Sequence, residues 1–208
     1  MPPLVRAWDD MSMVKITDKN VGLRSAGTDW REGGSLKTRD GRKMVIYKHG
    51  NHRSRLRTPL ISATRSPKEL FERRVKHCEN RQIKANIVPN TKITLINPNV
   101  TLAMGFPVLR MKDEMNHYGV KSAYGDGRTE YTNPFYENEF LLLWIVCPKQ
   151  IVCTWTWPQV KKQAKANGWT LEQWWQQELM VKFRRHEDAR IAGKQLCDDV
   201  AACQCCGH

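Results

Sequence analysis

The chain has 208 residues, a formal net charge of +13 and 40% hydrophobic residues. A chain of this length and hydrophobicity can bury a core without disulfide bonds, which excludes a disordered tail and a small disulfide-stapled domain. No apolar run approaches the roughly 20 residues that a membrane-spanning helix needs, and the N-terminus lacks the apolar segment of a secretory signal. The seven cysteines have no regular spacing, which is typical of free thiols. We therefore expect no transmembrane span and an intracellular, reducing compartment, either the cytoplasm or the mitochondrion.

Residues 1–36 form the first predicted segment. Turn signals such as Gly22, Gly27, Gly33 and Gly34 break it into pieces that have neither helical nor strand periodicity. We expect an extended N-terminal arm, ordered either on a partner or as a surface loop. A basic α+β core over residues 37–157 and a helical C-terminal segment with a Cys-rich tail over residues 158–208 complete the predicted domain organisation.

The excess of positive charge lies in residues 37–92. This segment carries 16 Lys and Arg against 4 Asp and Glu, whereas the rest of the chain is nearly balanced. A local positive potential attracts the phosphates of nucleic acids, and guanidinium groups, which dominate here, bind phosphate bidentately. The segment therefore indicates an RNA-binding or other polyanion-binding surface. A solubilising face, or a contact with an acidic protein, is the alternative.

Residues 40–57 predict a basic β-ribbon. Asp40-Gly41 and His49-Gly50-Asn51 resemble turns, and residues 44–48 between them are β-prone. A strand over residues 53–57 would place three arginines on one face. The residues predicted to bind nucleic acid are Arg39, Arg42, Lys43, Lys48, Arg53, Arg55, Arg57, Arg73, Arg74 and Arg81.

The stretch from Ser66 to Glu69 predicts the start of a helix. Ser66 occupies the cap position, Pro67 follows at the first helical position, and Glu69 completes a capping box. The helix should run to about residue 82, with Phe71 and Val75 on its buried side and a basic exposed side.

The core sheet is predicted from short β-prone runs. These runs cover residues 93–96, 100–103, 140–146 and 151–155. Two capped helices should follow, one over residues 156–166 and one from Thr170 to about residue 193. A helix-turn-helix motif is disfavoured for this pair, because Trp174 and Trp175 lie where base-reading residues would be needed.

The C-terminus carries the strongest cluster of potential metal ligands. Cys197, Cys203, Cys206 and His208 could together bind zinc, but their spacing is tighter than that of a zinc finger, which favours a free thiol-rich tail. No other cofactor is expected. His49 and His52 beside arginines also fit a metal-dependent nucleic-acid enzyme, although Asp40 is the only acidic residue between positions 33 and 68.

These patterns predict an α+β protein with a small, mostly antiparallel sheet, a basic central helix, a helical C-terminal part and an extended N-terminal arm. The favoured function is that of a non-catalytic structural or RNA-binding subunit of a large ribonucleoprotein, such as a ribosomal protein. The alternative is an accessory subunit of a multiprotein complex, such as an organellar respiratory assembly, whose basic segment would contact acidic subunits or anionic lipids. No catalytic residue is expected.

Overall fold

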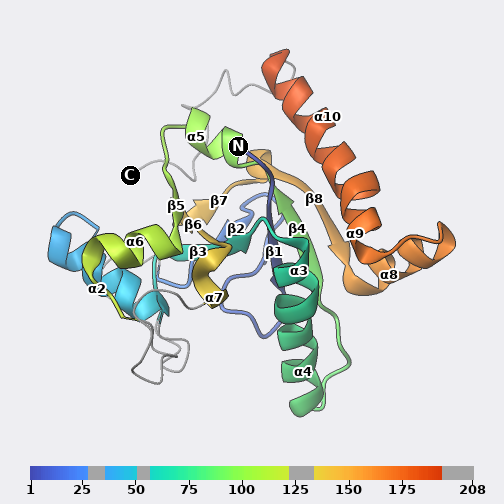
Figure 1. Ribbon diagram of the computed structural model, residues 1–208, viewed down its shortest axis with the longest axis horizontal. Coiled ribbons are helices and arrows are strands. Elements are labelled where there is room, and N and C mark those ends of the chain that lie inside the picture. Colours follow the sequence, from blue (N-terminus) through green and yellow to red (C-terminus); the bar gives the residue numbers. More distant parts are fainter. Residues whose placement is uncertain (28–35, 51–56, 122–133, 194–208) are drawn as a thin grey trace.

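The computed structural model describes residues 1–27, 36–50, 57–121 and 134–193. They form an α+β fold built on one antiparallel six-stranded sheet, with helices at both ends of it and a helical C-terminal part (Figure 1). The predicted fold class is therefore confirmed. No helix in the described ranges has both the length and the apolar character to cross a membrane.

The six strands are ordered β5-β6-β3-β1-β4-β8. Their bounds are β1 (Leu4–Trp8), β3 (Leu60–Thr64), β4 (Lys92–Ile96), β5 (Val108–Arg110), β6 (Glu139–Leu143) and β8 (Ile151–Thr156). A smaller sheet pairs β2 (Leu23–Arg24) with β7 (Ile145–Val146). The strands predicted around residues 93–96, 140–146 and 151–155 are thus present.

Strand β1 differs from the predicted extended arm. It lies in the middle of the large sheet and pairs with β4 along its whole length, from Leu4 opposite Ile96 to Trp8 opposite Lys92. Leu4 and Val5 are completely buried. The N-terminal residues are therefore part of the core, because burying their apolar side chains in the sheet is more favourable than leaving them on an arm.

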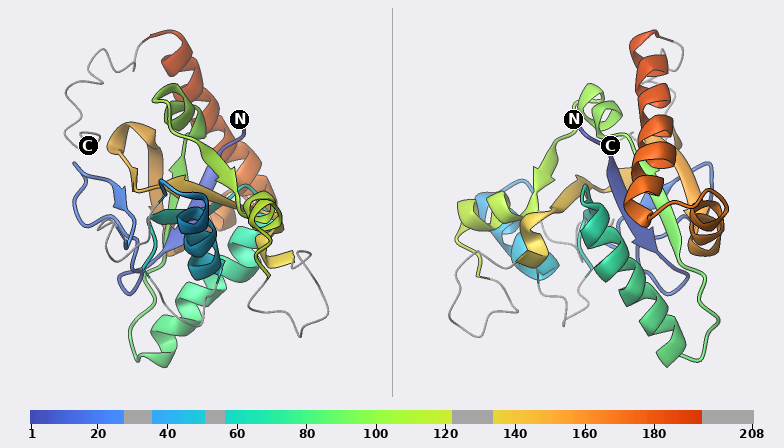
Figure 2. Two further views of the ribbon diagram at one scale, coloured as in Figure 1. Left: turned by 90° about the vertical axis from the view of Figure 1, so that its left-hand side faces the viewer. Right: turned by 45° about the vertical axis from the view of Figure 1, so that its right-hand side comes forward.

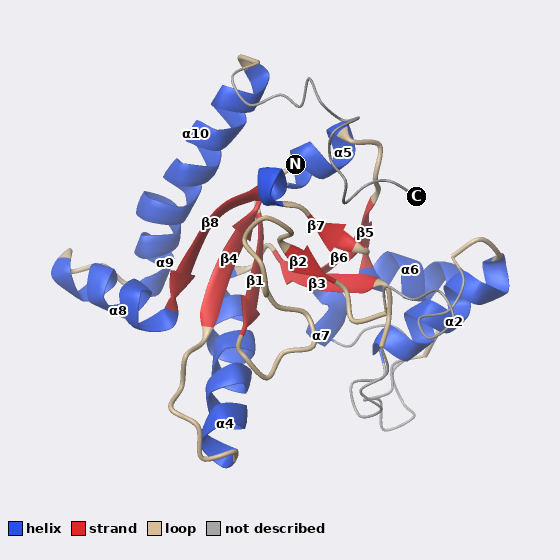
Figure 3. Ribbon diagram, turned by 180° about the vertical axis from the view of Figure 1, so that it is seen from behind, coloured by secondary structure: helices blue, strands red, loops and turns tan. Residues whose placement is uncertain are grey.

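The sheet divides where β1 meets β3. The two strands share a single pair, Val5 opposite Thr64, whereas β3 and β6 pair over five residues. Beyond that pair the strands diverge, so that β1, β4 and β8 run in one direction and β3 and β6 at a steep angle to it (Figure 3). We call the two parts the β1-β4-β8 half-sheet and the β3-β6-β5 half-sheet.

One long helix packs against the β1-β4-β8 half-sheet. It consists of α3 (Pro67–Glu69), a π-helical segment (Leu70–Val75) and α4 (Lys76–Lys84). Its start is the predicted one, because the Ser66 side chain accepts a hydrogen bond from the backbone N–H of Glu69. Phe71 and Val75 are buried as predicted.

The C-terminal helices cover the same half-sheet. They are α8 (Trp157–Ala166), α9 (Leu171–Trp174), a π-helical segment (Trp175–Leu179) and α10 (Met180–Ile191), and Figure 2 shows α10 alongside the strands. Thr156 and Thr170 cap α8 and α9 as predicted, each within a capping box. Trp174 and Trp175 are buried, which agrees with their predicted place in the core.

The predicted β-ribbon is wrong at its first strand, because residues 39–50 form helix α2 (Arg39–Gly50). The Thr38 hydroxyl accepts from the Gly41 N–H, so Thr38 starts a helix where a turn at Asp40-Gly41 was expected. Val45 and Ile46 of α2 are buried in a core shared with α6 (Met111–Tyr118). The rest of the predicted ribbon, residues 51–56, lies outside the described residues.

The strand predicted over residues 100–103 is also wrong. Residues 98–103 form helix α5 (Pro98–Ala103), in which the Asn97 side chain accepts from the Asn99 N–H and Pro98 takes the first helical position. Cap chemistry therefore overrides the β-propensity of this short run. The remaining elements are α7 (Pro134–Glu137), which leads into β6, and a 3-10 turn (Pro148–Gln150) before β8.

Candidate active site

Arg6 of β1 lies where the two half-sheets separate. Its Nη1 donates to the backbone carbonyl of Ser62 on β3 at 2.6 Å, and its Nη2 donates to the carbonyl of Val14 at 3.3 Å. A continued β1–β3 ladder would place Ser62 opposite Ala7, but the only pair is Val5 with Thr64. The guanidinium thus satisfies a carbonyl that the diverging strands leave without a backbone partner.

Glu139 is the first residue of β6 and is 1% exposed. It lies directly opposite Thr64 on β3, so it shares a sheet face with Ser62, two residues away along β3. The Ser62 hydroxyl donates to Glu139 Oε1. The antiparallel register therefore brings together two polar residues that are 77 positions apart.

His49 completes the group from the last turn of α2. Its Nε2 lies 3.0 Å from Ser62 Oγ and 3.5 Å from Glu139 Oε1, and its Nδ1 lies 2.8 Å from Thr58 Oγ1. Because the single Ser62 proton is directed at Glu139, Ser62 Oγ must accept from His49, so His49 carries a proton on Nε2. Hydrogen bonds run from His49 to Ser62 to Glu139. We call Arg6, His49, Thr58, Ser62 and Glu139 the Glu139 cluster.

The Glu139 carboxyl is held ionised. Burial raises its pKa, but the hydrogen bond from His49, the charge of Arg74 and the hydrogen bond from Ser62 together outweigh burial and lower the pKa to about 2. Burial and the nearby Arg74 lower the pKa of Arg6 to about 10. At neutral pH the cluster therefore contains a buried carboxylate on β6 and a protonated guanidinium on β1, the two strands that flank β3.

Two atoms of the cluster have no hydrogen-bond partner within the described part of the chain. They are Glu139 Oε2, an acceptor, and Arg6 Nε, a donor, and both are buried. A buried polar atom without a partner costs roughly 1–3 kcal/mol, so it needs a structural or functional explanation. His49 and Ser62 are partly exposed, which leaves an edge of the cluster open to solvent. A ligand hydroxyl would satisfy Glu139 Oε2, and an acceptor oxygen would satisfy Arg6 Nε.

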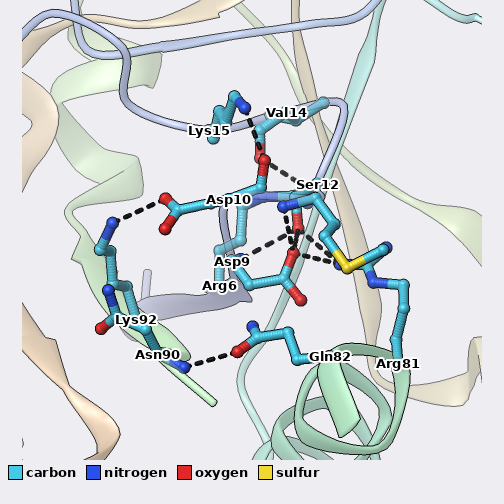
Figure 4. A network of polar contacts seen from close by, with 11 residues as sticks. Arg6, Asp9, Asp10, Ser12, Val14, Lys15, Arg81, Gln82, Asn90 and Lys92 are labelled. Atoms are coloured by element: carbon cyan, nitrogen blue, oxygen red, sulfur yellow. Dashed lines mark hydrogen bonds and ion pairs between the residues drawn. The ribbon is translucent and has the colours of Figure 1, made fainter. Parts of the chain in front are cut away.

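A second polar network fixes the loop after β1 (Figure 4). The Arg81 Nη2 of α4 donates to Asp9 Oδ1, and Ser12 Oγ donates to the same oxygen at 2.9 Å. Asp9 is completely buried, and the pKa of its carboxyl is lowered because these hydrogen bonds and the Arg81 charge outweigh burial, which raises it. The network holds the turn that presents the Val14 carbonyl to Arg6.

Seven of the ten predicted nucleic-acid-binding residues lie on two helices. Arg39, Arg42, Lys43 and Lys48 all lie on α2. Those on the long helix have acidic partners within the chain, since Arg73 and Arg74 donate to Glu69 and Arg81 donates to Asp9. Arg57 is exposed at the surface, and Arg53 and Arg55 lie outside the described residues.

The predicted metal sites cannot be placed in the structure. Cys197, Cys203, Cys206 and His208 lie outside the described residues, as does His52. His49 is described, and both of its ring nitrogens face hydroxyl groups. Across the described ranges, no three His, Cys, Asp or Glu side chains gather closely enough to hold a metal ion.

The sequence analysis did not identify Arg6, Ser62 and Glu139 as candidate functional residues. A signal was present, because each is a polar residue in or at the end of an apolar strand, in the segments LVRAW, LISAT and EFLLL. A polar residue at such a position is often buried and paired. Which residue it pairs with depends on strand order, which local pattern does not reveal.

A family model matches the first three quarters of the chain. Residues 1–160 match the family described as "Domain of unknown function (DUF7587)", and the chain belongs to this family. The matched region contains all six strands of the large sheet and every residue of the Glu139 cluster. No curated protein is similar enough in sequence to count as a relative.

Proposed function

We propose that this DUF7587 protein is an enzyme that transfers or hydrolyses the glycosyl group of a phosphate-bearing donor such as a nucleotide. The observation that carries the proposal is the state of Glu139, which is buried and ionised, with Oε1 held by Ser62 and Oε2 without a partner among the described residues. Buried ionisable groups with strongly shifted pKa values are concentrated at functional sites. The proposal differs from the non-catalytic role expected from the sequence, because the sequence pattern did not bring Glu139 and Arg6 together.

The hydrogen-bond directions argue against a serine nucleophile. An activated serine needs a neighbouring base that accepts its proton, but here His49 Nε2 donates to Ser62. The group that accepts the Ser62 proton is Glu139, and a carboxylate with a pKa of about 2 is a weak base. Ser62 and His49 are therefore positioning residues that orient Glu139 and keep it ionised.

An ionised carboxylate is suited to stabilise positive charge, above all when one of its oxygens, like Oε2 of Glu139, accepts no hydrogen bond from the described residues. When the bond between the anomeric carbon of a sugar and its leaving group breaks, the electron pair departs with the leaving group and the sugar becomes oxocarbenium-like. A carboxylate fixed beside that carbon stabilises the developing charge, most strongly where water is excluded. In the ground state Glu139 Oε2 would accept a hydrogen bond from a sugar hydroxyl. A water molecule or an acceptor group then bonds to the anomeric carbon and releases its proton to solvent.

The lowered pKa values of Glu139 and Glu137 favour a donor whose leaving group departs without being protonated. Protonation of a poor leaving group needs a carboxylic acid with a raised pKa, but the pKa of Glu139 is about 2. Hydrogen bonds from Lys112 and Arg110, with their charges, also lower the pKa of Glu137, two residues before it. Suitable donors therefore carry a leaving group that departs without protonation, such as a nucleoside diphosphate or a cationic heterocycle. Arg6 Nε can donate to a phosphate oxygen of such a donor.

The test is turnover of a donor panel by the full chain. The panel contains nucleoside diphosphate sugars, a glycosyl phosphate and the dinucleotide NAD+, and chromatography measures the leaving group that is released. Glu139→Gln keeps the shape of the side chain and removes its charge, so we expect the rate to fall about 100-fold or more while donor affinity changes little. Glu187→Gln is the matched control, since Glu187 also has a pKa of about 2 but lies on α10, paired with Arg190.

The control variant should keep the wild-type rate. Absence of turnover with every donor, or a Glu139→Gln variant as fast as wild type, would overturn the proposal. A thermal melt of each variant establishes that it is folded before its rate is interpreted.

A further inference from the structure

Helix α2 has one buried side and one exposed basic side. Val45 and Ile46 pack into the core with α6, whereas Arg39, Lys43 and Tyr47 are exposed. These three residues are spaced four apart, so they form one stripe along the helix, about 12 Å long. We call Arg39, Lys43 and Tyr47 the α2 stripe. Figure 1 shows α2 at the outer end of the molecule, away from α10.

The cations of the α2 stripe are free of acidic partners in the described part of the chain. No ion pair joins Arg39 or Lys43 to a carboxylate there, whereas Arg74 and Arg81 form ion pairs with buried acids. The only acidic residue of α2 itself is Asp40. No carboxylate among the described residues therefore neutralises the positive charge of the α2 stripe, and an external anion would complement it.

Apolar surface accompanies this charge. Tyr47 and Met44 are each 49% exposed, although both are large hydrophobic side chains. An exposed aromatic ring among cations is the combination that binds single-stranded nucleic acid, because the cations contact phosphates while the ring stacks on an unpaired base. An acidic protein segment or an anionic lipid surface would use the charge but has no base to stack on Tyr47.

We propose that the α2 stripe binds single-stranded nucleic acid, with Arg39 and Lys43 on the phosphates and Tyr47 stacked on a base. The inference does not rest on the proposed enzymatic activity. The bound strand would lie on the outer side of the helix whose last turn carries His49 of the Glu139 cluster. It narrows the predicted nucleic-acid-binding surface to α2, because the predicted arginines of the long helix pair with Glu69 and Asp9.

The experiment is fluorescence anisotropy with the full chain and labelled single-stranded oligonucleotides. One probe is an unstructured oligouridine RNA and the other is the DNA of the same sequence, each titrated at several salt concentrations. In the variant with Arg39→Ala and Lys43→Ala, the slope of log affinity against log salt should flatten by about 1.4, the value for two contacts to a single strand. Tyr47→Ala should weaken binding about tenfold or more and leave the slope unchanged.

The matched control removes two exposed lysines from another helix. Lys162→Ala with Lys165→Ala on α8 deletes the same charge as the double variant, at residues that are also exposed. This control should leave both the affinity and the slope close to wild type. If it weakens binding as much as the α2 variant, the attraction is only that of the overall charge, and the proposal fails.

Three outcomes decide whether the ligand is single-stranded nucleic acid. Binding to either oligonucleotide with the expected dependence on α2 supports the proposal, and a preference between RNA and DNA identifies the natural source. Absence of binding to both probes overturns it. The proposal is also overturned if phosphatidylserine vesicles or polyglutamate bind as the oligonucleotides do. In that case the Arg39→Ala, Lys43→Ala variant loses the same affinity for them, and Tyr47→Ala has no effect.

Discussion

The two halves of the central sheet have different interiors. On the β1-β4-β8 half-sheet, aromatic rings pack against one another, with Trp174 edge-on to Trp155 at 5.2 Å between ring centroids. On the β3-β6-β5 half-sheet, Ser62 and Glu139 lie on the same face as the apolar core that packs against α2 and α6. The comparison indicates that one half mainly supplies stability, while the other tolerates buried polar groups that cost stability.

The Glu139 cluster lies at the boundary between the two half-sheets, where surrounding contacts hold its buried polar groups in place. Arg6 reaches it from the stable half-sheet, and the Asp9 and Arg81 network fixes the loop behind Arg6. Polar groups without partners persist in a fold when the surrounding structure holds them in place. The seam between the half-sheets is thus a rigid frame for the proposed site.

The largest change in stability is expected in the β1-β4-β8 half-sheet. Trp174 is completely buried and donates through Nε1 to Gln163 Oε1 at 3.0 Å. Trp174→Ala should lower the free energy of unfolding by about 3–5 kcal/mol, because it leaves a large cavity. Urea denaturation measures the change. Ile191→Ala, at a side chain that is 68% exposed, should cost less than about 1 kcal/mol, and equal losses for the two variants would contradict the assigned core.

A smaller effect is expected at the seam. Asp9 is completely buried and paired with Arg81, whereas the adjacent Asp10 is 67% exposed and paired with Lys92. Asp9→Ala should cost about 2–4 kcal/mol because it leaves a partly buried guanidinium without its anion. Asp10→Ala should cost about 1 kcal/mol or less. Similar losses for these neighbours in thermal unfolding would show that the network does not anchor the loop.

Much of the fold follows from local chemistry. The caps at Ser66, Thr156 and Thr170 predicted three helices at the correct places, because a side chain that accepts a backbone N–H acts within three residues. The same chemistry explains the errors. The caps at Thr38 and Asn97 start α2 and α5, where the β-prone runs over residues 44–48 and 100–103 had predicted strands.

Local sequence patterns could not predict the candidate site, because its residues are far apart in the sequence. Arg6 bonds to a residue 56 positions away, and Ser62 bonds to one 77 positions away. These contacts exist because β1 enters the middle of the sheet and β6 pairs with β3, and no periodicity within one segment determines strand order. The charge excess of residues 37–92 is real, but the sequence does not reveal that Arg74 and Arg81 are paired internally.

The most direct test of the proposed role of Glu139 is the pKa of its carboxyl. NMR of the protein labelled with carbon-13 at glutamate side chains follows each carboxyl signal against pH, and the Glu139→Gln variant identifies the Glu139 signal. The structure predicts a pKa of about 2, so this signal should stay unchanged from pH 7 down to about pH 4, while exposed glutamates titrate. Because the pKa is lowered on folding, Glu139 should also stabilise the protein above its unfolded pKa, and this contribution should be lost as pH falls toward 2. A Glu139 signal that titrates at or above its ordinary pKa of 4.5 would contradict the ionised, oriented carboxylate on which the proposed chemistry depends.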